Sequence, residues 1–444
     1  MTSTAAAGPA RVPRILVAGG GFAGLECARR LSRSRQGAFD VTLVNPEDYS
    51  LYTPLLPDVA GGLVDPRHAA VPLAKALRGV RLIRGLVTSA DLAAHTAEVS
   101  IAGRPGEPET VSWDRLVLTP GSVTRLADIP GLRDRARGLK TLAEALYLRD
   151  HLLGQLELSV SEPDEQLCQA CRTVVVVGAS YAGTELVAQL RGLADDAARH
   201  HRFRPSDVRF LLLDIADEVM PEVGPELGDR VLRVLRGRGI DVRLGVTLTR
   251  VDDDRVTLSD DSVIPARTVA WVTGVTASPL IASLGLELDH GRLAVTETLG
   301  VPGHPDVFAG GDAAAVPNAT EHQSVTPPTA QHASRQGRLL ARNVRASLGY
   351  GRAGRYRHRD LGLVVDLGPS FAVANPLGVR LSGLPAKAIT RGYHLYALPR
   401  ADNRVKVAMD YASNMGGTRP VVSLGLVDPQ RARVTDSEHT QEIS

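Results

Sequence analysis

One sequence pattern occurs twice in this chain. Residues 14–26 read RILVAGGGFAGLE and residues 173–185 read TVVVVGASYAGTE, so that equivalent positions lie 159 residues apart. Each copy is a short apolar run, a glycine-rich turn and an amphipathic stretch, which predicts strand, loop and helix. In a chain of 444 residues, two such copies predict two units of the same kind, each large enough to bury its own core.

The glycine spacing within each copy has a physical purpose. The first glycine makes a tight turn, the second lets the backbone approach a pyrophosphate, and the third lets the helix pack closely on the strand. The N–H groups and the dipole of the helix N-terminus then face the negative phosphates. The first copy has Gly19, Gly21 and Gly24, whereas the second has Gly178, Ser180 and Gly183. We therefore expect two dinucleotide sites, with the serine weakening the second.

The residue that follows the second strand of each unit predicts which dinucleotide is bound. An acid at this place normally holds the adenosine ribose. Strand 41–44 ends at Asn45, which can still bond a ribose, and strand 210–213 ends at Asp214. Because a carboxylate repels the 2′-phosphate of NADPH, Asp214 favours NADH over NADPH.

The composition argues against several other classes of protein. Lys and Arg total 51 against 49 Asp and Glu, and the basic residues, almost all Arg, are scattered along the sequence. Together with only 4% aromatic residues, this predicts no nucleic-acid partner and no basic binding surface. No secretory signal and no run of about 18 apolar residues are evident. Three cysteines, an odd number, fit a reducing cytosol, so we expect a cytoplasmic protein.

Three further segments extend the pattern. Residues 305–314 (PDVFAGGDAA) read as a strand that ends in Gly-Gly-Asp at a helix start, and residues 116–122 (LVLTPGS) and 270–275 (AWVTGV) follow other strands. With the first glycine loop, these segments resemble the late FAD motif and the two crossovers of two-dinucleotide-binding flavoproteins. The resemblance implies FAD on the first unit, with Asp312 on its ribityl chain, and NADH on the second.

Within these flavoproteins the chain resembles the type II NADH dehydrogenases, which are single-subunit NADH:quinone oxidoreductases. The similarity lies in residues 51–68 (from LYTPLLP to DPRH), in 327–337 (PPTAQHASRQG), and in short segments of 357–383. It implies that hydride passes from NADH to the flavin, and that two electrons pass on to a quinone or quinone-like acceptor. Arg335 departs from the family's pattern, which has glutamine there, and the family's tryptophans near residues 386–388 are absent.

The resemblance also implies the architecture. We expect an α/β fold with two Rossmann-like dinucleotide-binding domains, as in glutathione reductase, and a small α+β C-terminal domain. The expected parts are a discontinuous FAD domain (12–125 and 290–345), an NAD(P)H domain (126–289), a C-terminal domain (350–425) and disordered tails (1–11 and 426–444). Residues 356–410 are the expected surface of a homodimer. Peripheral attachment to the inner face of the cell membrane is implied too, although residues 411–444 lack an evident amphipathic anchor.

The same resemblance assigns site residues, and no metal site is expected because four suitable ligands are not available. The catalytic candidates are Glu185, Gln331, His332 and Arg335. The FAD contacts expected are Gly19, Gly21, Phe22, Ala23, Gly24, Asn45, Pro54, Leu55, Val87, Thr119, Pro120, Gly121, Gly311, Asp312, Gln331, His332 and Ala333. The NAD contacts expected are Gly178, Ser180, Tyr181, Ala182, Gly183, Glu185, Asp214, Thr273 and Gly274.

Three alternatives stay open. The first is a biosynthetic flavoenzyme that acts on a dedicated small molecule, which Arg335 and the missing tryptophans favour. The second is a thiol–disulfide reductase that uses Cys168 and Cys171, because a C-x-x-C before the second nucleotide loop resembles thioredoxin reductase. The pair precedes Gly178 so closely, however, that we expect it to lie away from the flavin. The third is a dinucleotide sensor without enzymatic activity.

Overall fold

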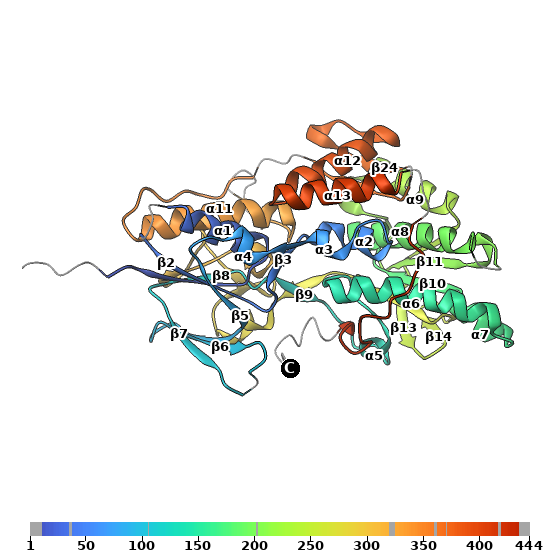
Figure 1. Cartoon of the computed structure of the whole chain (residues 1–444), viewed down its shortest axis with the longest axis horizontal. Coiled ribbons are helices and arrows are strands. Elements are labelled where there is room, and N and C mark those ends of the chain that lie inside the picture. Colours follow the sequence, from blue (N-terminus) through green and yellow to red (C-terminus); the bar gives the residue numbers. More distant parts are fainter. Residues whose placement is uncertain are drawn as a thin grey trace, which may run out of the picture.

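The computed structural model describes residues 11–34, 38–104, 106–200, 203–318, 325–358, 362–369, 371–415 and 419–434. Two sheets with parallel cores, each flanked by helices, form the body of the molecule (Figure 1). The expected α/β fold is confirmed. Of the predicted disordered tails, residues 1–10 and 435–444 lie outside the described residues, whereas residues 426–434 are described and include the buried Ala432 and Val434.

The first repeat forms the centre of an eight-stranded sheet with the order β20-β21-β8-β1-β2-β5-β6-β7. Strand β1 pairs in parallel with β2 and β8, so that Val17 lies between Leu43 and Val117. Strand β21 joins next to β8 from much later in the chain. The elements are β1 (Arg14–Ala18), α1 (Phe22–Ser32), β2 (Asp40–Asn45), β5 (Arg81–Asp91), β6 (Thr96–Ile101), β7 (Glu109–Ser112), β8 (Arg115–Leu118), β20 (Gly300–Val301), β21 (His304–Ala309) and α11 (Ala330–Ser347).

Helix α11 packs directly against α1 beside this sheet. A Cβ atom at Gly337 would lie 2.3 Å from the carbonyl oxygen of Ala23, so only glycine permits this approach. The late segment 300–347 therefore packs with the first repeat.

The second repeat forms a four-stranded parallel sheet with the order β12-β11-β10-β16. All five residues of β10 are buried, which explains their uninterrupted apolar character. A small antiparallel sheet, β13-β14-β15, lies beside it. The elements are α6 (Leu142–Ser161), α7 (Glu165–Cys171), β10 (Thr173–Val177), α8 (Tyr181–Ala198), β11 (Arg209–Asp214), α9 (Pro225–Gly237), β12 (Ile240–Leu244), β13 (Leu248–Val251), β14 (Arg255–Leu258), β15 (Val263–Pro265) and β16 (Thr268–Trp271).

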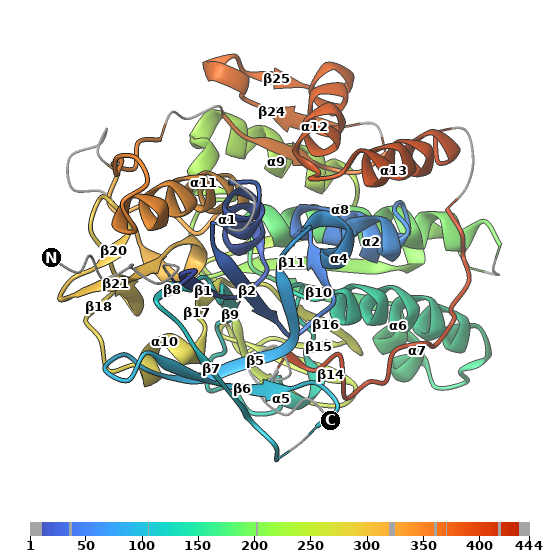
Figure 2. The same ribbon diagram turned by 60° about the vertical axis from the view of Figure 1, so that its left-hand side comes forward.

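The C-terminal segment covers the upper side of the molecule in two views (Figures 1 and 2). It contains the antiparallel sheet β23-β24-β25 and two helices. Val365, Val373 and Val407 join the same buried cluster as Leu186 of α8, so this segment packs on the second repeat. The elements are β23 (Val364–Asp366), β24 (Ala372–Ala374), η5 (Pro376–Gly378), β25 (Leu381–Ser382), α12 (Leu384–Ala397) and α13 (Ala401–Ser413).

Short elements complete the chain, and no helix among the described residues is long and apolar enough to cross a membrane. Strands β9 and β17 pair with each other. The short elements are β3 (Tyr49–Leu51), η1 (Thr53–Leu55), α2 (Leu56–Ala60), α3 (Pro66–Ala69), β4 (Ala70–Pro72), α4 (Leu73–Ala76), β9 (Ser122–Thr124), α5 (Leu132–Arg135), η2 (Pro205–Asp207), η3 (Pro221–Val223), β17 (Val275–Ala277), α10 (Pro279–Ser283), β18 (Leu288–Asp289), β19 (Arg292–Ala294), η4 (Gly311–Ala313) and β22 (Ala314–Ala315).

Candidate functional site

The first glycine loop is shaped by close backbone approaches. Gly19 has φ +100°, and a Cβ atom there would lie 2.1 Å from the carbonyl oxygen of Thr119. A Cβ atom at Gly24 would lie 1.8 Å from the carbonyl oxygen of Gly19. Gly21 differs, because a Cβ atom there would meet no described atom within 4 Å. It is the N-cap of α1 and no side chain caps this helix, so the first-turn N–H groups remain available to a ligand.

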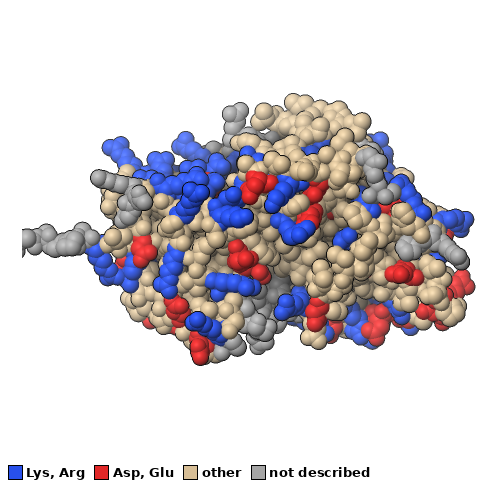
Figure 3. Space-filling model, viewed as in Figure 1, with Lys and Arg blue, Asp and Glu red and all other residues tan. Residues whose placement is uncertain are grey.

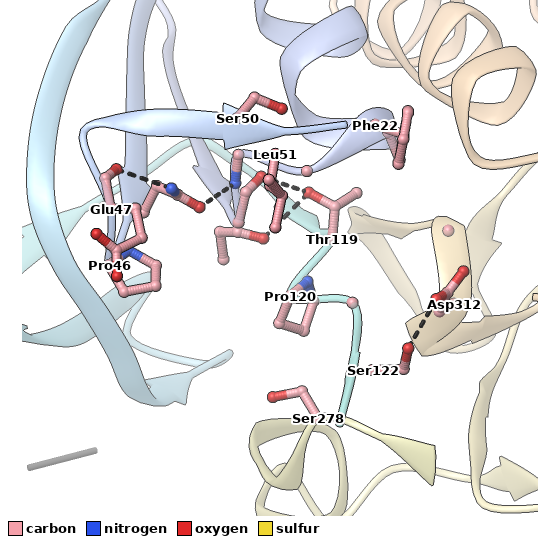
Figure 4. A pocket seen from close by; sticks show the side chains of 18 of the residues that line it. Phe22, Pro46, Glu47, Ser50, Leu51, Thr119, Pro120, Ser122, Ser278 and Asp312 are labelled. Carbon is pink, nitrogen blue, oxygen red and sulfur yellow. Dashed lines mark hydrogen bonds between the residues drawn. The ribbon is translucent and has the colours of Figure 1, made fainter. Parts of the chain in front are cut away.

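A cavity of about 410 Å³ opens beside this loop, between the end of β2 and η4 (Figure 4). Asp312 reaches it from η4, and its Oδ2 accepts a hydrogen bond from Ser122 Oγ at 2.7 Å. Lys140 Nζ donates to the same Ser122 oxygen at 2.9 Å. Twelve of the predicted FAD contacts line the cavity, namely Gly19, Gly21, Phe22, Ala23, Asn45, Val87, Thr119, Pro120, Gly121, Gly311, Asp312 and Ala333.

The other predicted FAD contacts do not line the cavity. Gly24 lies beneath the loop, and Leu55 is fully buried in η1 beside Pro54. Conversely, sequence reasoning missed several lining residues, including Gly20, Pro46, Glu47, Ser122, Lys140 and Ser278. The sequence did mark the position of Lys140, because this residue directly precedes a recognisable helix start, the capping box Thr141–Glu144 of α6.

Asn45 holds the loop in place through both ends of its amide. Its Oδ1 accepts from Gly20 N at 2.7 Å, and its Nδ2 donates to the carbonyl oxygens of Glu47 at 2.8 Å and Tyr49 at 3.2 Å. Glu47, two residues later, brings a carboxylate to the cavity wall. A carboxylate therefore lies close to position 45, where the sequence has an amide.

The second glycine loop repeats the geometry of the first. Gly178 has φ +111°, and a Cβ atom there would lie 2.4 Å from the carbonyl oxygen of Val272. A Cβ atom at Gly183 would lie 1.9 Å from the carbonyl oxygen of Gly178. Ser180 is the N-cap of α8, but its hydroxyl makes no capping hydrogen bond. The α8 N-terminus therefore presents its N–H groups as α1 does.

Asp214 occupies the place of Asn45 in the second unit. Its Oδ2 accepts from Ala179 N at 2.5 Å and its Oδ1 from Ala216 N at 2.8 Å, so this carboxylate also fixes a glycine loop. The remaining predicted NAD contacts surround the same loop. Tyr181 and Ala182 are half-buried in the first turn of α8, while Thr273 and Gly274 are exposed after β16.

Aromatic and polar groups from distant elements meet between the first loop and the C-terminal segment. The rings of Phe22 and Tyr52 lie 5.7 Å apart, and Tyr52 Oη lies 3.3 Å from His394 Nδ1. Burial lowers the pKa of His394 to about 4, so its ring is neutral at pH 7. Burial raises the pKa of the neighbouring Tyr393, while the side chains of Arg335 and Gln331 lower it by less, so α11 lies beside this group.

Glu185 lies half-buried on α8, and its Oε1 accepts from Asp366 N at 2.7 Å. Burial, together with the carboxylates of Asp366 and Asp58, raises the pKa of Glu185 well above its ordinary value. The hydrogen bond from Asp366 N and the charge of Lys387 lower this pKa, but by less. Lys387 Nζ donates to the two Asp366 oxygens at 2.5 and 2.6 Å. Sequence reasoning named Glu185 but missed its partners Asp366 and Lys387, because they follow it by 181 and 202 residues and no local motif marks them.

His332 and Arg335 face a different group of side chains. His332 Nδ1 lies 2.8 Å from Tyr356 Oη, and Arg335 Nη1 lies 2.6 Å from His358 Nδ1. The rings of His332 and His358 are 4.0 Å apart. Burial raises the pKa of Tyr356 to about 12. The four catalytic candidates thus divide into Glu185 and Gln331 near α12, and His332 and Arg335 near residues 356–358.

Asp58 leads to a prediction on pH. It is buried, accepts from Gln189 Nε2 at 2.9 Å and from Tyr411 Oη at 2.8 Å, and has a pKa raised to about 6 by burial and by Asp366. Because the folded state favours the neutral acid, this contribution to stability is present at low pH and is lost as the pH rises towards 6. We expect the Tm of Asp58→Asn to fall less than that of the unaltered protein between about pH 4.5 and about pH 7.5.

Calorimetry at the two pH values measures this difference. Asp128→Asn, which removes an exposed carboxylate, is the matched control and should keep the pH dependence of the unaltered protein. An identical pH dependence of Tm in Asp58→Asn would contradict the role of Asp58.

The cysteine pair lies far from the cavity. Helix α7, which carries both thiols, is at the end of the molecule opposite α11 and β2 (Figure 1). Both thiols are free; Cys168 Sγ donates to the carbonyl oxygen of Ser159 at 3.4 Å, and burial raises the pKa of Cys171. Within the described ranges, no group of His, Cys, Asp or Glu could hold a metal ion.

Known proteins are similar to this chain in sequence and in fold. The family model for pyridine nucleotide-disulphide oxidoreductases matches residues 13–337. The chain is 30% identical to the type II NADH:quinone oxidoreductase Ndh of Mycobacterium tuberculosis, over 98% of this chain and 95% of that protein. It is also 30% identical to the demethylphylloquinone reductase NdbB of Synechocystis, over 92% of this chain and 96% of the relative. The solved structure of NDH2 from Plasmodium falciparum in complex with NADH superposes with a TM-score of 0.85, at 17% identity, over 93% of this chain and 100% of that one.

Proposed function

The chain belongs to the pyridine nucleotide-disulphide oxidoreductases and, among them, to the type II NADH:quinone oxidoreductases, and on this premise we propose how its residues perform the reaction. The protein is an enzyme that uses FAD and NADH and passes two electrons to a quinone, as the sequence predicted. One observation carries this conclusion. Two glycine loops of the same geometry each present an uncapped helix N-terminus, and the first of them borders a cavity that Asp312 reaches.

The first unit fits FAD. Gly21 leaves the space that a Cβ atom would fill, so a pyrophosphate can approach the backbone N–H groups of α1. Asp312, hydrogen-bonded by Ser122, would hold the ribityl hydroxyls, and Lys140 adds a positive charge 3.9 Å from the Asp312 carboxylate. When bound, the flavin supplies the chemistry of accepting a hydride and releasing two electrons, while the protein provides orientation and electrostatics.

The second unit binds NADH, and we assign Glu185 to the placement of the nicotinamide. The raised pKa of Glu185 keeps a proton on its carboxyl group at pH values where an exposed glutamate is ionised. A protonated carboxyl can donate a hydrogen bond to an amide oxygen, such as that of a carboxamide. On the other side we assign Gln331 and Tyr393, which lie close together, to the placement of the acceptor.

Asp214 leads to a prediction on coenzyme preference. Its carboxylate lies at the end of β11 and repels a 2′-phosphate, so we expect Asp214→Asn to reduce the preference for NADH over NADPH by about tenfold. Anaerobic flavin bleaching with each coenzyme measures the ratio of the two rates. Asp217→Asn removes the same charge from the same loop, where the side chain is exposed, and should leave the ratio unchanged. Faster bleaching of the unaltered enzyme by NADPH would refute the assignment.

The cysteine pair leads to a further prediction. Because Cys168 and Cys171 lie away from the cavity, we expect Cys168→Ser/Cys171→Ser to oxidise NADH with a quinone at the unaltered rate. Steady-state turnover with a soluble quinone measures this rate. A large loss of turnover with full flavin content would instead favour the thiol–disulfide alternative.

A dedicated small-molecule acceptor is the second candidate function. The observation that favours it is Arg335, a cation 2.6 Å from His358, where the family's pattern has glutamine. Reoxidation of the reduced enzyme by a panel of ubiquinone, menaquinone and naphthoquinone analogues distinguishes a respiratory quinone reductase from an enzyme with a dedicated acceptor. Rapid reoxidation by the common respiratory quinones supports the first function, and failure with all of them supports the second.

We also propose that the enzyme is cytoplasmic and docks peripherally on the inner face of the cell membrane, where quinones reside. The support is a set of exposed apolar side chains in the C-terminal segment, including Leu377 (66% exposed), Leu384 (69%) and Tyr396 (77%). Dimerisation through residues 356–410 stays a prediction, which light scattering of the purified protein tests.

A further inference from the structure

Six arginines gather around a groove between α1 and α11. The groove has a volume of about 230 Å³, and apart from Ala341 every residue that lines it is an arginine. We call it the arginine groove, lined by Arg29, Arg30, Arg33, Arg338, Arg342 and Arg345. The sequence-based expectation of no basic surface is therefore wrong. Residues 29–33 end α1, while 338, 342 and 345 recur at helical spacing on α11, and the packing of the two helices joins the sets.

Ion pairs with carboxylates neutralise only a small part of the positive charge of the arginine groove. Glu26 pairs with Arg29, with Arg30 at 2.8 Å and with Arg338 at 3.2 Å. Arg33 and Arg345 are exposed and make no ion pair in the part of the chain that the structure describes. Six guanidinium groups thus face a single carboxylate, so the groove attracts anions strongly.

Acidic residues are missing from two whole segments near the groove. Residues 325–358, which include α11, contain no Asp or Glu, and neither do residues 367–401, which include α12. The chain as a whole carries almost equal numbers of acids and bases. The acids are therefore concentrated elsewhere, and an anionic partner would meet little repulsion from these two segments.

An apolar surface lies on the same side of the molecule as the arginine groove. Helices α1, α11, α12 and α13 lie along the upper side of the molecule in both ribbon views (Figures 1 and 2). In Figure 3, blue side chains gather at the upper left over α1 and α11, while the top over α12 is uncharged. Leu377, Val379, Leu384 and Tyr396 are exposed there by 57–77%.

We propose that the arginine groove binds the phosphate headgroups of anionic phospholipids and so turns the apolar C-terminal surface towards the bilayer. Guanidinium groups bind phosphate oxygens through two parallel N–H bonds, and apolar side chains beside a basic face enter the headgroup boundary. An apolar neighbour favours a lipid surface over a nucleic acid, which needs basic and stacking residues. The inference rests on the membrane docking proposed above and names the lipid class.

Sedimentation of the purified holoenzyme with vesicles tests this proposal. We expect phosphatidylglycerol vesicles to bind at least about tenfold more tightly than phosphatidylcholine vesicles, and about 0.5 M NaCl to remove the difference. Arg33→Gln/Arg338→Gln/Arg345→Gln should lose about tenfold of the binding to phosphatidylglycerol. The control Arg204→Gln/Arg250→Gln/Arg255→Gln changes the net charge equally but removes arginines that pair with aspartates elsewhere, and should retain the binding.

Several results would overturn the proposal. They are equal binding to both kinds of vesicle, equal loss in the two triple variants, tighter binding of duplex DNA than of phosphatidylglycerol vesicles, and full competition by inorganic phosphate at constant ionic strength. The last would assign the groove to a soluble anion. Flavin content and Tm check that each variant folds. NADH oxidation with a water-soluble quinone should be the same in all of them, and its absence in the unaltered enzyme would refute the proposed function without deciding the lipid result.

Discussion

A variant with Gly21→Ala folds normally but binds FAD at least about 100-fold more weakly, a loss of about 3 kcal/mol. The backbone at Gly21 has φ −68°, which alanine adopts without strain, and the added methyl group would meet no described atom within 4 Å. In the holoenzyme that methyl group lies where the pyrophosphate must approach the start of α1. Fluorescence titration of the deflavinated protein with FAD gives the affinity, and the Tm of the same apoprotein reports the fold.

Two further glycine variants show whether the effect belongs to the ligand. Gly19→Ala forces a methyl group to within 2.1 Å of the Thr119 carbonyl oxygen at φ +100°, so we expect it to lower both Tm and FAD affinity. Gly154→Ala in α6 adds a methyl group in open space on an ordinary helix and should affect neither binding nor Tm adversely. Unchanged FAD affinity in Gly21→Ala would disprove that the first loop carries the pyrophosphate.

The second large effect separates the two nucleotides. Gly183→Ala should retain FAD yet slow flavin reduction by NADH about 100-fold, an increase of about 3 kcal/mol in the barrier. A Cβ atom at Gly183 would lie 1.9 Å from the Gly178 carbonyl oxygen, so α8 must move away from β10 and its N–H groups leave the phosphate position. Anaerobic stopped-flow absorbance of the flavin measures the rate.

Two controls accompany this variant. Reduction by dithionite bypasses the NADH site and should proceed normally in Gly183→Ala. Gly237→Ala adds a methyl group in open space on α9 of the same unit and should keep the unaltered rate with NADH. Normal reduction of Gly183→Ala by NADH would show that the coenzyme does not use the second loop.

The parts of the site that were predictable are those set by local backbone geometry. A turn with positive φ and a close approach of two backbones require glycine, so Gly19, Gly24, Gly178 and Gly183 could be read from spacing alone. The Gly-Gly-Asp segment was recognisable for the same reason, since a strand that ends at a tight turn leaves a short motif. These motifs led to the correct fold class and cofactors.

The remaining features depend on side chains that tertiary packing brings together. Asn45 and Asp214 both bond the loop backbones, a use that a rule about ribose does not foresee. The pair of Asp366 and Lys387 reaches Glu185 only because the C-terminal sheet packs on α8. The arginine groove likewise exists only where two helices about 300 residues apart in sequence meet, so arginines that look scattered in sequence become one surface.

Anaerobic double-mixing stopped-flow of the holoenzyme follows electron transfer from NADH to the flavin and from the flavin to a quinone in one experiment. The enzyme is first mixed with one equivalent of NADH, and the product is then mixed with a menaquinone analogue while flavin absorbance is followed. We expect bleaching of the flavin in the first step and full recovery of its absorbance in the second, both faster than steady-state turnover. A flavin that NADH fails to bleach, or one that is bleached but that no quinone reoxidises, would contradict this expectation.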